Sequence, residues 1–272
     1  MIGVRSRKRP MTDSLLIERA GPVARLRLNR PELHNAFDAE LIATLTSALD
    51  RLGADPDIRI VVLEGAGASF SAGADLNWMR GMAAASEAAN RDDALALARL
   101  MCALDALAKP TIARVHGAAF GGGVGLVACC DIAVAANEAK FGLTESRLGL
   151  LPAVISPYVV AAIGARHARR YFASAEIFDA AEAHRVGLLH EVVAADLLDA
   201  AIDRQVALLL KAGPIASASA KRLVAETVRQ ADRDALDEAN AGLIARLRVS
   251  PEGQEGIGAF LEKRPAAWTA KE

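Results

Sequence analysis

Cysteine is scarce in this 272-residue sequence, which contains only Cys102, Cys129 and Cys130. An odd number argues against a disulfide framework, and none of the three has the spacing of a metal ligand. No pair of histidines has metal-binding spacing beside a carboxylate either. We therefore expect small buried thiols in a reducing compartment, and we expect the protein to bind no metal.

The sequence also lacks a charge excess and a long hydrophobic run. It carries 32 basic and 33 acidic residues, which gives no electrostatic basis for binding nucleic acid or a membrane surface. No stretch reaches the ~18 charge-free apolar residues of a membrane span. The basic start has no apolar segment of a signal peptide, so we interpret residues 1–12 as a disordered tail. These absences predict a cytoplasmic protein.

Nucleotide-binding motifs are missing, although glycine is concentrated at positions 121, 122, 123 and 125. The run is not G-x-G-x-x-G, and no Gly-Lys-Ser/Thr follows it, so a nucleoside-triphosphate site is excluded. Glycines here would instead let a ligand approach the backbone at the start of a helix. Unpaired N–H groups and a partial positive charge at such a point stabilise a bound oxyanion.

Strand and helix patterns alternate along the chain until about residue 195. Apolar runs predict strands within 15–29 and over 58–63, 111–115, 131–135 and 189–193. Helical spacing follows Asp38 and recurs near 88–108, 122–130, 153–163 and 180–186, with a mobile stretch at 77–92. Only helical patterns remain beyond that point, at 196–211, 214–230, 232–247 and 251–261. We predict an α/β core over 13–195 and a helical region over 196–272.

Two glycine-bearing loops, 70–76 and 120–126, each follow a predicted strand. Bare backbone segments of this kind can direct two N–H groups at one developing negative charge. The pair therefore indicates chemistry at a carbonyl group. His116 precedes the second loop and could hold that loop by hydrogen bonding.

The order of several motifs resembles the crotonase superfamily of enoyl-CoA hydratases and isomerases. The matching segments are 28–31 with Asn35-Ala36, 70–76, 115–123, 130–133, Phe141-Gly142 with Glu145 and Gly149, and Phe-Leu-Glu-Lys-Arg-Pro at 260–265. The likeness extends over about residues 15–268. Several independent motifs with compatible spacing make a chance match improbable.

This resemblance implies a spiral of β-β-α turns with a C-terminal helical region for trimerisation, often in a dimer of trimers. It also implies an acyl-CoA thioester as substrate, so that coenzyme A is part of the substrate and no separate cofactor is needed. By motif position, the oxyanion hole would be the N–H groups of Ala74 and Gly122. The coenzyme A contacts implied in the same way are Leu33, Ala72, Asp75 and Leu76, with Phe260 and Lys263 reaching the coenzyme A of a neighbouring subunit.

Glu145 is the carboxylate that the resemblance places in the catalytic position. Apolar neighbours would raise its pKa and let it act as acid or base near neutrality. Related hydratases with two glutamates carry the other at the position of Gly125, and glycine transfers no proton. Either Glu145 handles both protons, another group such as Glu87, a water or a substrate carboxylate supplies the second function, or the reaction differs. If the pocket is otherwise ordinary, Gly125→Glu should increase hydration.

Three functions therefore stay open: an enoyl-CoA hydratase, a double-bond isomerase that needs one carboxylate, and a non-catalytic CoA-binding paralogue. We expect the hydratase. Residues 123–126 and 153–157 resemble a branch that includes methylglutaconyl-CoA and isohexenylglutaconyl-CoA hydratases. Such substrates carry a distal carboxylate, which Arg147 or Arg80 could bind.

Overall fold

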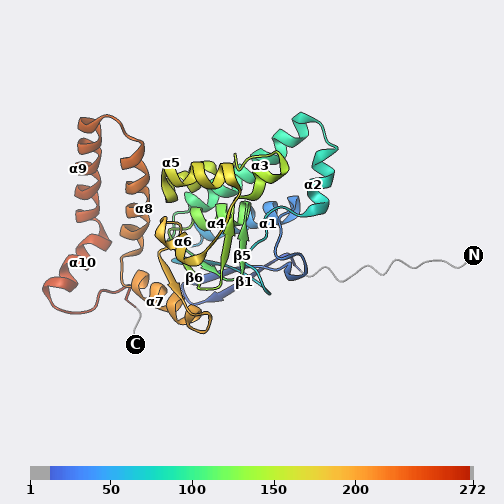
Figure 1. The fold of residues 1–272 in the computed structure, drawn as a ribbon. Coiled ribbons are helices and arrows are strands. Elements are labelled where there is room, and N and C mark those ends of the chain that lie inside the picture. The colour runs from blue at the N-terminus through green and yellow to red at the C-terminus, as the bar shows by residue number, and fades with distance from the viewer. Residues whose placement is uncertain (1–12, 270–272) are drawn as a thin grey trace, which may run out of the picture.

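Two β-sheets organise the chain in the computed structural model, which describes residues 13–269 (Figure 1). The predicted tail, 1–12, lies outside this range. The larger sheet has the order β1-β2-β3-β4-β6-β9, and every pairing except the antiparallel β1–β2 hairpin is parallel. Its strands are β1 (Leu15–Ala20), β2 (Val23–Leu28), β3 (Ile60–Gly65), β4 (Thr111–Val115), β6 (Ile132–Ala136) and β9 (Glu191–Val193). The predicted α/β class is confirmed.

A second, three-stranded sheet was not predicted from the sequence. It consists of β5 (Ala118–Phe120), β7 (Lys140–Gly142) and β8 (Ile177–Asp179), in the order β5-β7-β8. Each strand has three residues, which is too short to show an alternating pattern. The short sheet matters because β5 leads directly into the second glycine loop.

The two faces of the large sheet are chemically different. On β2, Ala24, Leu26 and Leu28 face the main hydrophobic core, whereas Arg25 and Arg27 face the opposite side. That opposite side holds a smaller core that includes α7 (Leu198–Leu210). This alternation follows from the two-residue period of a strand.

Helices cover the main core. They are α1 (Ala39–Ala54), α3 (Glu87–Asp105), α4 (Gly122–Cys129), α5 (Ser156–Ser174, kinked at Gly164) and α6 (Ala180–Arg185). Three short 3-10 helices span Pro31–Leu33, Thr144–Leu148 and Ala195–Leu197. The Asp38 carboxylate caps α1 by accepting the Leu41 N–H at 2.8 Å, as the sequence predicts.

The stretch 77–92, expected to be mobile, is largely helical. It contains α2 (Leu76–Ala83) and the first turns of α3. Asp75 caps α2 and Ser86 caps α3 by accepting backbone N–H groups, so two side-chain caps define where these helices begin. Figure 1 shows α2 beyond one end of α3, at the edge of the molecule.

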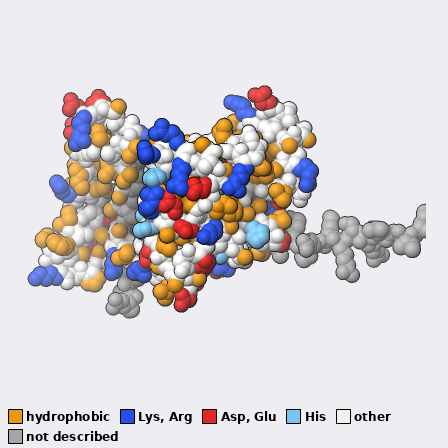
Figure 2. Space-filling view, in the orientation of Figure 1, with side chains coloured by type: hydrophobic (Ala, Val, Ile, Leu, Met, Phe, Trp, Pro, Cys, Tyr) orange, Lys and Arg blue, Asp and Glu red, His pale blue; other side chains and the backbone are white. Residues whose placement is uncertain are grey.

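Three helices near the C-terminus stand beside the body: α8 (Pro214–Arg229), α9 (Arg233–Val249) and α10 (Pro251–Leu261) (Figure 1). None of the residues of α8 is buried, and several apolar side chains on these helices are exposed, including Val224, Val228 and Phe260. Figure 2 shows hydrophobic side chains over this part of the surface. Within residues 13–269, no helix is long and apolar enough to cross a membrane.

Candidate functional site

The two glycine loops lie side by side. The Ser71 N–H donates to the Ala118 carbonyl at 3.0 Å, and the Phe120 N–H donates to the Ser71 carbonyl at 2.9 Å. These bonds form a parallel bridge between Ser71 and Ala119. Because the two segments run in the same direction, the bridge brings their following residues, Ala74 and Gly122, toward the same region.

Ala74 presents a free backbone N–H. The Phe37 N–H donates to the Gly73 carbonyl at 2.6 Å, and the Asp75 N–H donates to the Phe37 carbonyl at 2.8 Å. Since neighbouring residues in extended pairing direct their N–H groups to opposite sides, the Ala74 N–H is directed away from Phe37. It has no acceptor within residues 13–269, and Ala74 is exposed.

Gly122 supplies the second free N–H as the first residue of α4. A helix leaves its first N–H groups without intrahelical acceptors, and Gly122 donates to no acceptor in the described part of the chain. The preceding Gly121 has φ 50° and ψ −117°, which favours glycine. A Cβ built on Gly73 would lie 3.0 Å from the Phe120 carbonyl oxygen and 3.9 Å from Gly121 Cα. The loops therefore meet one residue before each predicted donor.

The Glu145 carboxylate lies beside the second loop. A Cβ built on Gly121 would be 3.1 Å from its Oε1. Its Oε2 is buried without a hydrogen-bond partner among residues 13–269. Burial raises the pKa of Glu145, opposed only by a hydrogen bond from its own backbone, and no neighbouring charge contributes. A carboxylate whose pKa is raised is a stronger base than an ordinary glutamate, and it can accept and return a proton.

Gly125 lies one helical turn beyond Gly121, on the same face of α4. A Cβ built there would lie 2.3 Å from Ile155 Cγ2, 2.9 Å from Ile155 Cβ and 3.3 Å from Met101 Cε. The buried Ile155 side chain thus fills the space that a side chain at 125 would enter. The condition attached to the Gly125→Glu prediction, an otherwise ordinary pocket, is therefore not met at this position, and Gly125→Glu alone does not test the chemistry.

The residues implied as coenzyme A contacts surround the first loop. Leu33 and Leu76 are exposed, and the half-buried Ala72 donates its N–H to the His34 carbonyl at 2.9 Å. Asp75 differs because its buried carboxylate accepts the N–H groups of Asn77 and Trp78 and pairs with Arg30 at 2.9 Å. Its side chain is engaged in holding the loop and α2.

Phe260 and Lys263 lie at the end of α10, away from these loops. Figure 1 places α10 on the opposite side of the molecule from α2. The Phe260 side chain is 82% exposed, and Lys263 follows the helix with a positive φ of 54°. Within one chain the structure does not bring these two residues together with Glu145.

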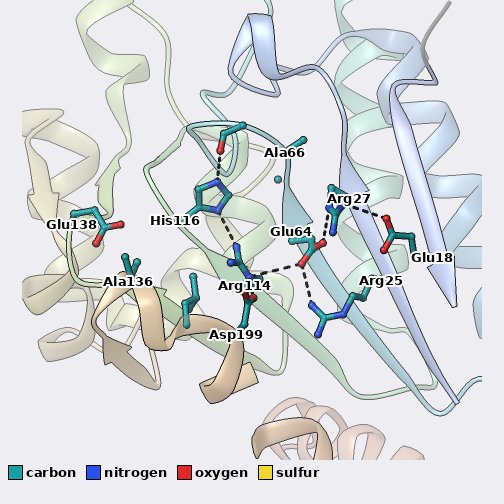
Figure 3. A pocket seen from close by; sticks show the side chains of 14 residues that line it. Glu18, Arg25, Arg27, Glu64, Ala66, Arg114, His116, Ala136, Glu138 and Asp199 are labelled. Atoms are coloured by element: carbon teal, nitrogen blue, oxygen red, sulfur yellow. Dashed lines mark hydrogen bonds and ion pairs between the residues drawn. The ribbon is translucent and has the colours of Figure 1, made fainter. Parts of the chain in front are cut away.

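A charged cleft that the sequence did not reveal lies on the other face of the large sheet (Figure 3). Its volume is about 710 Å³. The buried Glu64 carboxylate accepts from Arg27 at 2.7 Å and Arg25 at 3.2 Å. Arg114 pairs with Asp199 at 2.6 Å. Because guanidinium and carboxylate groups are paired here, the cleft has no excess of positive charge for an anion. None of the implied site residues lines it.

His116 also lines this cleft, and its bond differs from the predicted one. Its Nε2 lies 2.8 Å from the carbonyl oxygen of Gly67, in the segment that leads into the first loop. The prediction that the His116 side chain holds the second loop was therefore wrong, because the ring bonds the segment before the first loop. The signal was hidden because Gly67 and His116 are far apart in sequence.

Comparisons with known proteins match the whole body of the chain. The family model described as Enoyl-CoA hydratase/isomerase matches residues 18–271. A probable enoyl-CoA hydratase of Mycobacterium tuberculosis is 37% identical, with 94% of this chain and 98% of the relative covered. The 2,3-dehydroadipyl-CoA hydratase of Escherichia coli is 33% identical over 93% and 97%. The crystal structure of an enoyl-CoA hydratase from Shewanella pealeana has a TM-score of 0.91 at 44% identity, covering 94% and 96%.

Proposed function

Because the chain belongs to the enoyl-CoA hydratase/isomerase family, we propose that it is an enoyl-CoA hydratase, a lyase that adds water to the double bond of a 2-enoyl-CoA thioester. The single observation that carries this proposal is the partnerless Glu145 oxygen beside two adjoining loops with free N–H groups. Coenzyme A enters as part of the substrate, and we propose no separate cofactor.

The N–H groups of Ala74 and Gly122 would hold the thioester oxygen. When water adds to C3, negative charge moves through the double bond to that oxygen and forms an enolate. Preorganised N–H donors stabilise this charge without reorganising during the reaction. One such donor is typically worth about 3 kcal/mol of transition-state stabilisation, or roughly 10²–10³ in rate.

Glu145 would act first as a base and then as an acid. As the water oxygen forms a bond to C3, the carboxylate takes a proton from that water. The protonated Glu145 then returns a proton to C2, which restores the carboxylate and the thioester. Among the described residues, no second carboxylate contributes to the pKa of Glu145. Ile155 fills the space beside Gly125. A mechanism with Glu145 as the single acid–base group is therefore the simplest interpretation.

A double-bond isomerase is the second candidate. A single carboxylate can move a proton between C2 and C4 through the same enolate, and Gly125 beside Ile155 favours it because no second acid fits there unaided. The non-catalytic alternative gains no support from Glu145, because a buried carboxylate oxygen without a hydrogen-bond partner among residues 13–269 costs free energy in a protein that does not use it.

We further propose that the acyl group is branched or carries a distal carboxylate, such as 3-methylglutaconyl-CoA. The Escherichia coli relative is a 2,3-dehydroadipyl-CoA hydratase, and a dehydroadipyl thioester carries a distal carboxylate. Arg80 and Arg147 are exposed, and Arg80 donates to Asn77 at 2.8 Å without a carboxylate partner in the described residues. Either guanidinium could bind such a carboxylate.

The proposed assembly is a trimer or a dimer of trimers. It is supported by the apolar side chains that α8, α9 and α10 expose, since faces of this kind usually contact a partner. In this assembly Phe260 and Lys263 would reach a neighbouring subunit's coenzyme A. Light scattering would measure the mass, and Val228→Glu should reduce it if this face is the interface.

The enzymatic test uses purified protein with crotonyl-CoA, 3-methylglutaconyl-CoA and a 3-enoyl-CoA, and follows the absorbance of the conjugated thioester. Hydration should occur and should fall strongly in Glu145→Gln, whereas Glu138→Gln, on the opposite face of the sheet, should keep full rate. Full hydration by Glu145→Gln would remove the role proposed for that residue. Isomerisation without hydration would instead establish the second candidate.

A further inference from the structure

His116 makes hydrogen bonds to both ends of a tight turn, residues 67–70, that leads into the first loop. Its ring nitrogen Nε2 lies 2.8 Å from the Gly67 carbonyl oxygen, and its own carbonyl accepts the Phe70 N–H at 2.9 Å. One residue at the end of β4 therefore holds both ends of the turn 67–70. This turn is the route from β3 to the Ala74 donor.

The backbone of the turn 67–70 is closely packed and cannot shift far without steric overlap. Gly117, next to His116, has φ 59°, and a Cβ built there would lie 1.9 Å from the Ala68 carbonyl oxygen. Gly67 also has a positive φ, of 75°. The backbone of the turn thus packs directly against the segment that leads into the second loop. The buried Asn35 amide donates to the Ala66 and Ser69 carbonyls at 2.8 and 2.7 Å, so Asn35 and His116 hold the turn from two sides.

Arg114 determines which nitrogen of His116 carries the proton. Its Nη1 lies 3.3 Å from His116 Nδ1, and a dashed line in Figure 3 marks this contact. A guanidinium only donates hydrogen bonds, so Nδ1 accepts, and the proton of the neutral ring is on Nε2. The ring therefore donates to Gly67. Asp199, on α7, accepts from Arg114 Nε at 2.6 Å and fixes the guanidinium.

The contacts continue from the turn 67–70 to both predicted donors. After the turn come the Ser71–Ala119 bridge and then the close approach of Gly73 to Phe120. A shift of the turn would move Ala74 relative to Gly122. We propose that His116, oriented by Arg114, is a positioning residue that sets the alignment of the two oxyanion-hole loops. This inference rests on the proposed function.

We expect a substitution of His116 to reduce stabilisation of the transition state and to leave ground-state binding of the substrate almost unchanged. Misaligned donors stabilise the enolate less, while the proposed coenzyme A contact at Leu33, outside that loop, remains. His116→Leu should lower kcat by about 10-fold or more, below the 10²–10³ for a deleted donor, with KM changed by less than about 2-fold. Arg114→Met should act in the same direction, and His116→Asn, which keeps a side-chain N–H donor, should recover part of the rate.

The experiment compares wild type, His116→Leu, His116→Asn, Arg114→Met and the control Arg27→Met. Arg27 lines the same cleft and also bonds Glu64, but it does not contact His116. Steady-state kinetics are measured with the best substrate. The absorbance of bound dimethylaminocinnamoyl-CoA is measured separately, because N–H donors that polarise its carbonyl shift the absorbance to longer wavelength without any turnover.

A reduced red shift and reduced kcat in His116→Leu and Arg114→Met, with wild-type values in Arg27→Met, support the proposal. Wild-type kcat and red shift in the His116 and Arg114 variants overturn it. If His116→Leu does not fold, Arg114→Met and His116→Asn decide on the same criteria. Loss of stability alone, with unchanged kcat per folded enzyme, also overturns it. A probe that binds the wild type without a red shift contradicts the oxyanion hole itself, which separates failure of the proposed function from failure of this inference.

Discussion

Replacing Gly125 with alanine puts a methyl group against Ile155. The new Cβ would lie 2.3 Å from Ile155 Cγ2 and 2.9 Å from Ile155 Cβ, both closer than carbon atoms approach in folded proteins. The isoleucine is 2% exposed and branched at Cβ, so it cannot turn away without displacing other core side chains. Either the side chain or the helix must move.

The magnitude follows from two opposing effects. Alanine is favoured over glycine within a helix by about 1 kcal/mol. Forcing an extra carbon into a packed core costs about 1–3 kcal/mol. We therefore expect Gly125→Ala to lower the free energy of unfolding by about 1 kcal/mol, although the substitution is stabilising at ordinary helix positions.

Chemical denaturation with and without changes at Ile155 measures this effect. Ile155→Val is the matched control, because valine keeps the Cγ2 methyl and only the terminal methyl is lost. Ile155→Ala removes the 2.3 Å contact. Gly125→Ala should be destabilising in the wild-type and Ile155→Val backgrounds, and it should be clearly less destabilising in Ile155→Ala, where only the 2.9 Å approach to Cβ remains.

An equal effect of Gly125→Ala in all three backgrounds would refute the packing argument. The same pair of positions gives a catalytic experiment. Gly125→Glu should gain no hydration of crotonyl-CoA alone, because Ile155 occupies the space, but it should gain some when combined with Ile155→Ala. A gain in the single variant would show that the space is not limiting.

Three further outcomes are expected. Glu145→Gln should lower kcat by about 10²–10⁴-fold in the absorbance assay. The same substitution should raise the Tm at neutral pH, because burial raises the pKa of Glu145 and its ionised form destabilises the fold at pH values above the ordinary glutamate pKa of 4.5. A lower Tm would contradict this. The kcat/KM profile should fall as pH decreases through that raised pKa, with one ascending limb, and a bell shape would indicate a second group. Asp75→Ala should lower the free energy of unfolding by about 2 kcal/mol in chemical denaturation, because it removes the α2 cap. Burial raises the pKa of Asp75, but the hydrogen bonds from Trp78, Asn77 and Arg30 outweigh it and lower the pKa. The stability that this carboxylate contributes is therefore lost as the pH falls through its pKa in the folded protein.

Local patterns in the sequence were enough for most elements. The strand at β3 follows from its apolar run, the start of α1 from Asp38, and the three C-terminal helices from their periodicity. The motif order was enough for the family. These features depend on near neighbours or on short segments, so one sequence contains the information.

Only the tertiary structure decided what surrounds those segments. The three-residue strands of the second sheet form because distant segments meet, and no local periodicity marks them. Likewise, the contact of Ile155 with Gly125 and the bond from His116 to Gly67 join residues that are far apart in the sequence. The burial of the Glu145 Oε2 atom also depends on the tertiary packing around it. The sequence by itself determined the fold class and named Glu145 as the candidate residue for moving a proton. Packing determined which space remains around that residue, because side-chain volumes and hydrogen bonds are settled only when the elements come together.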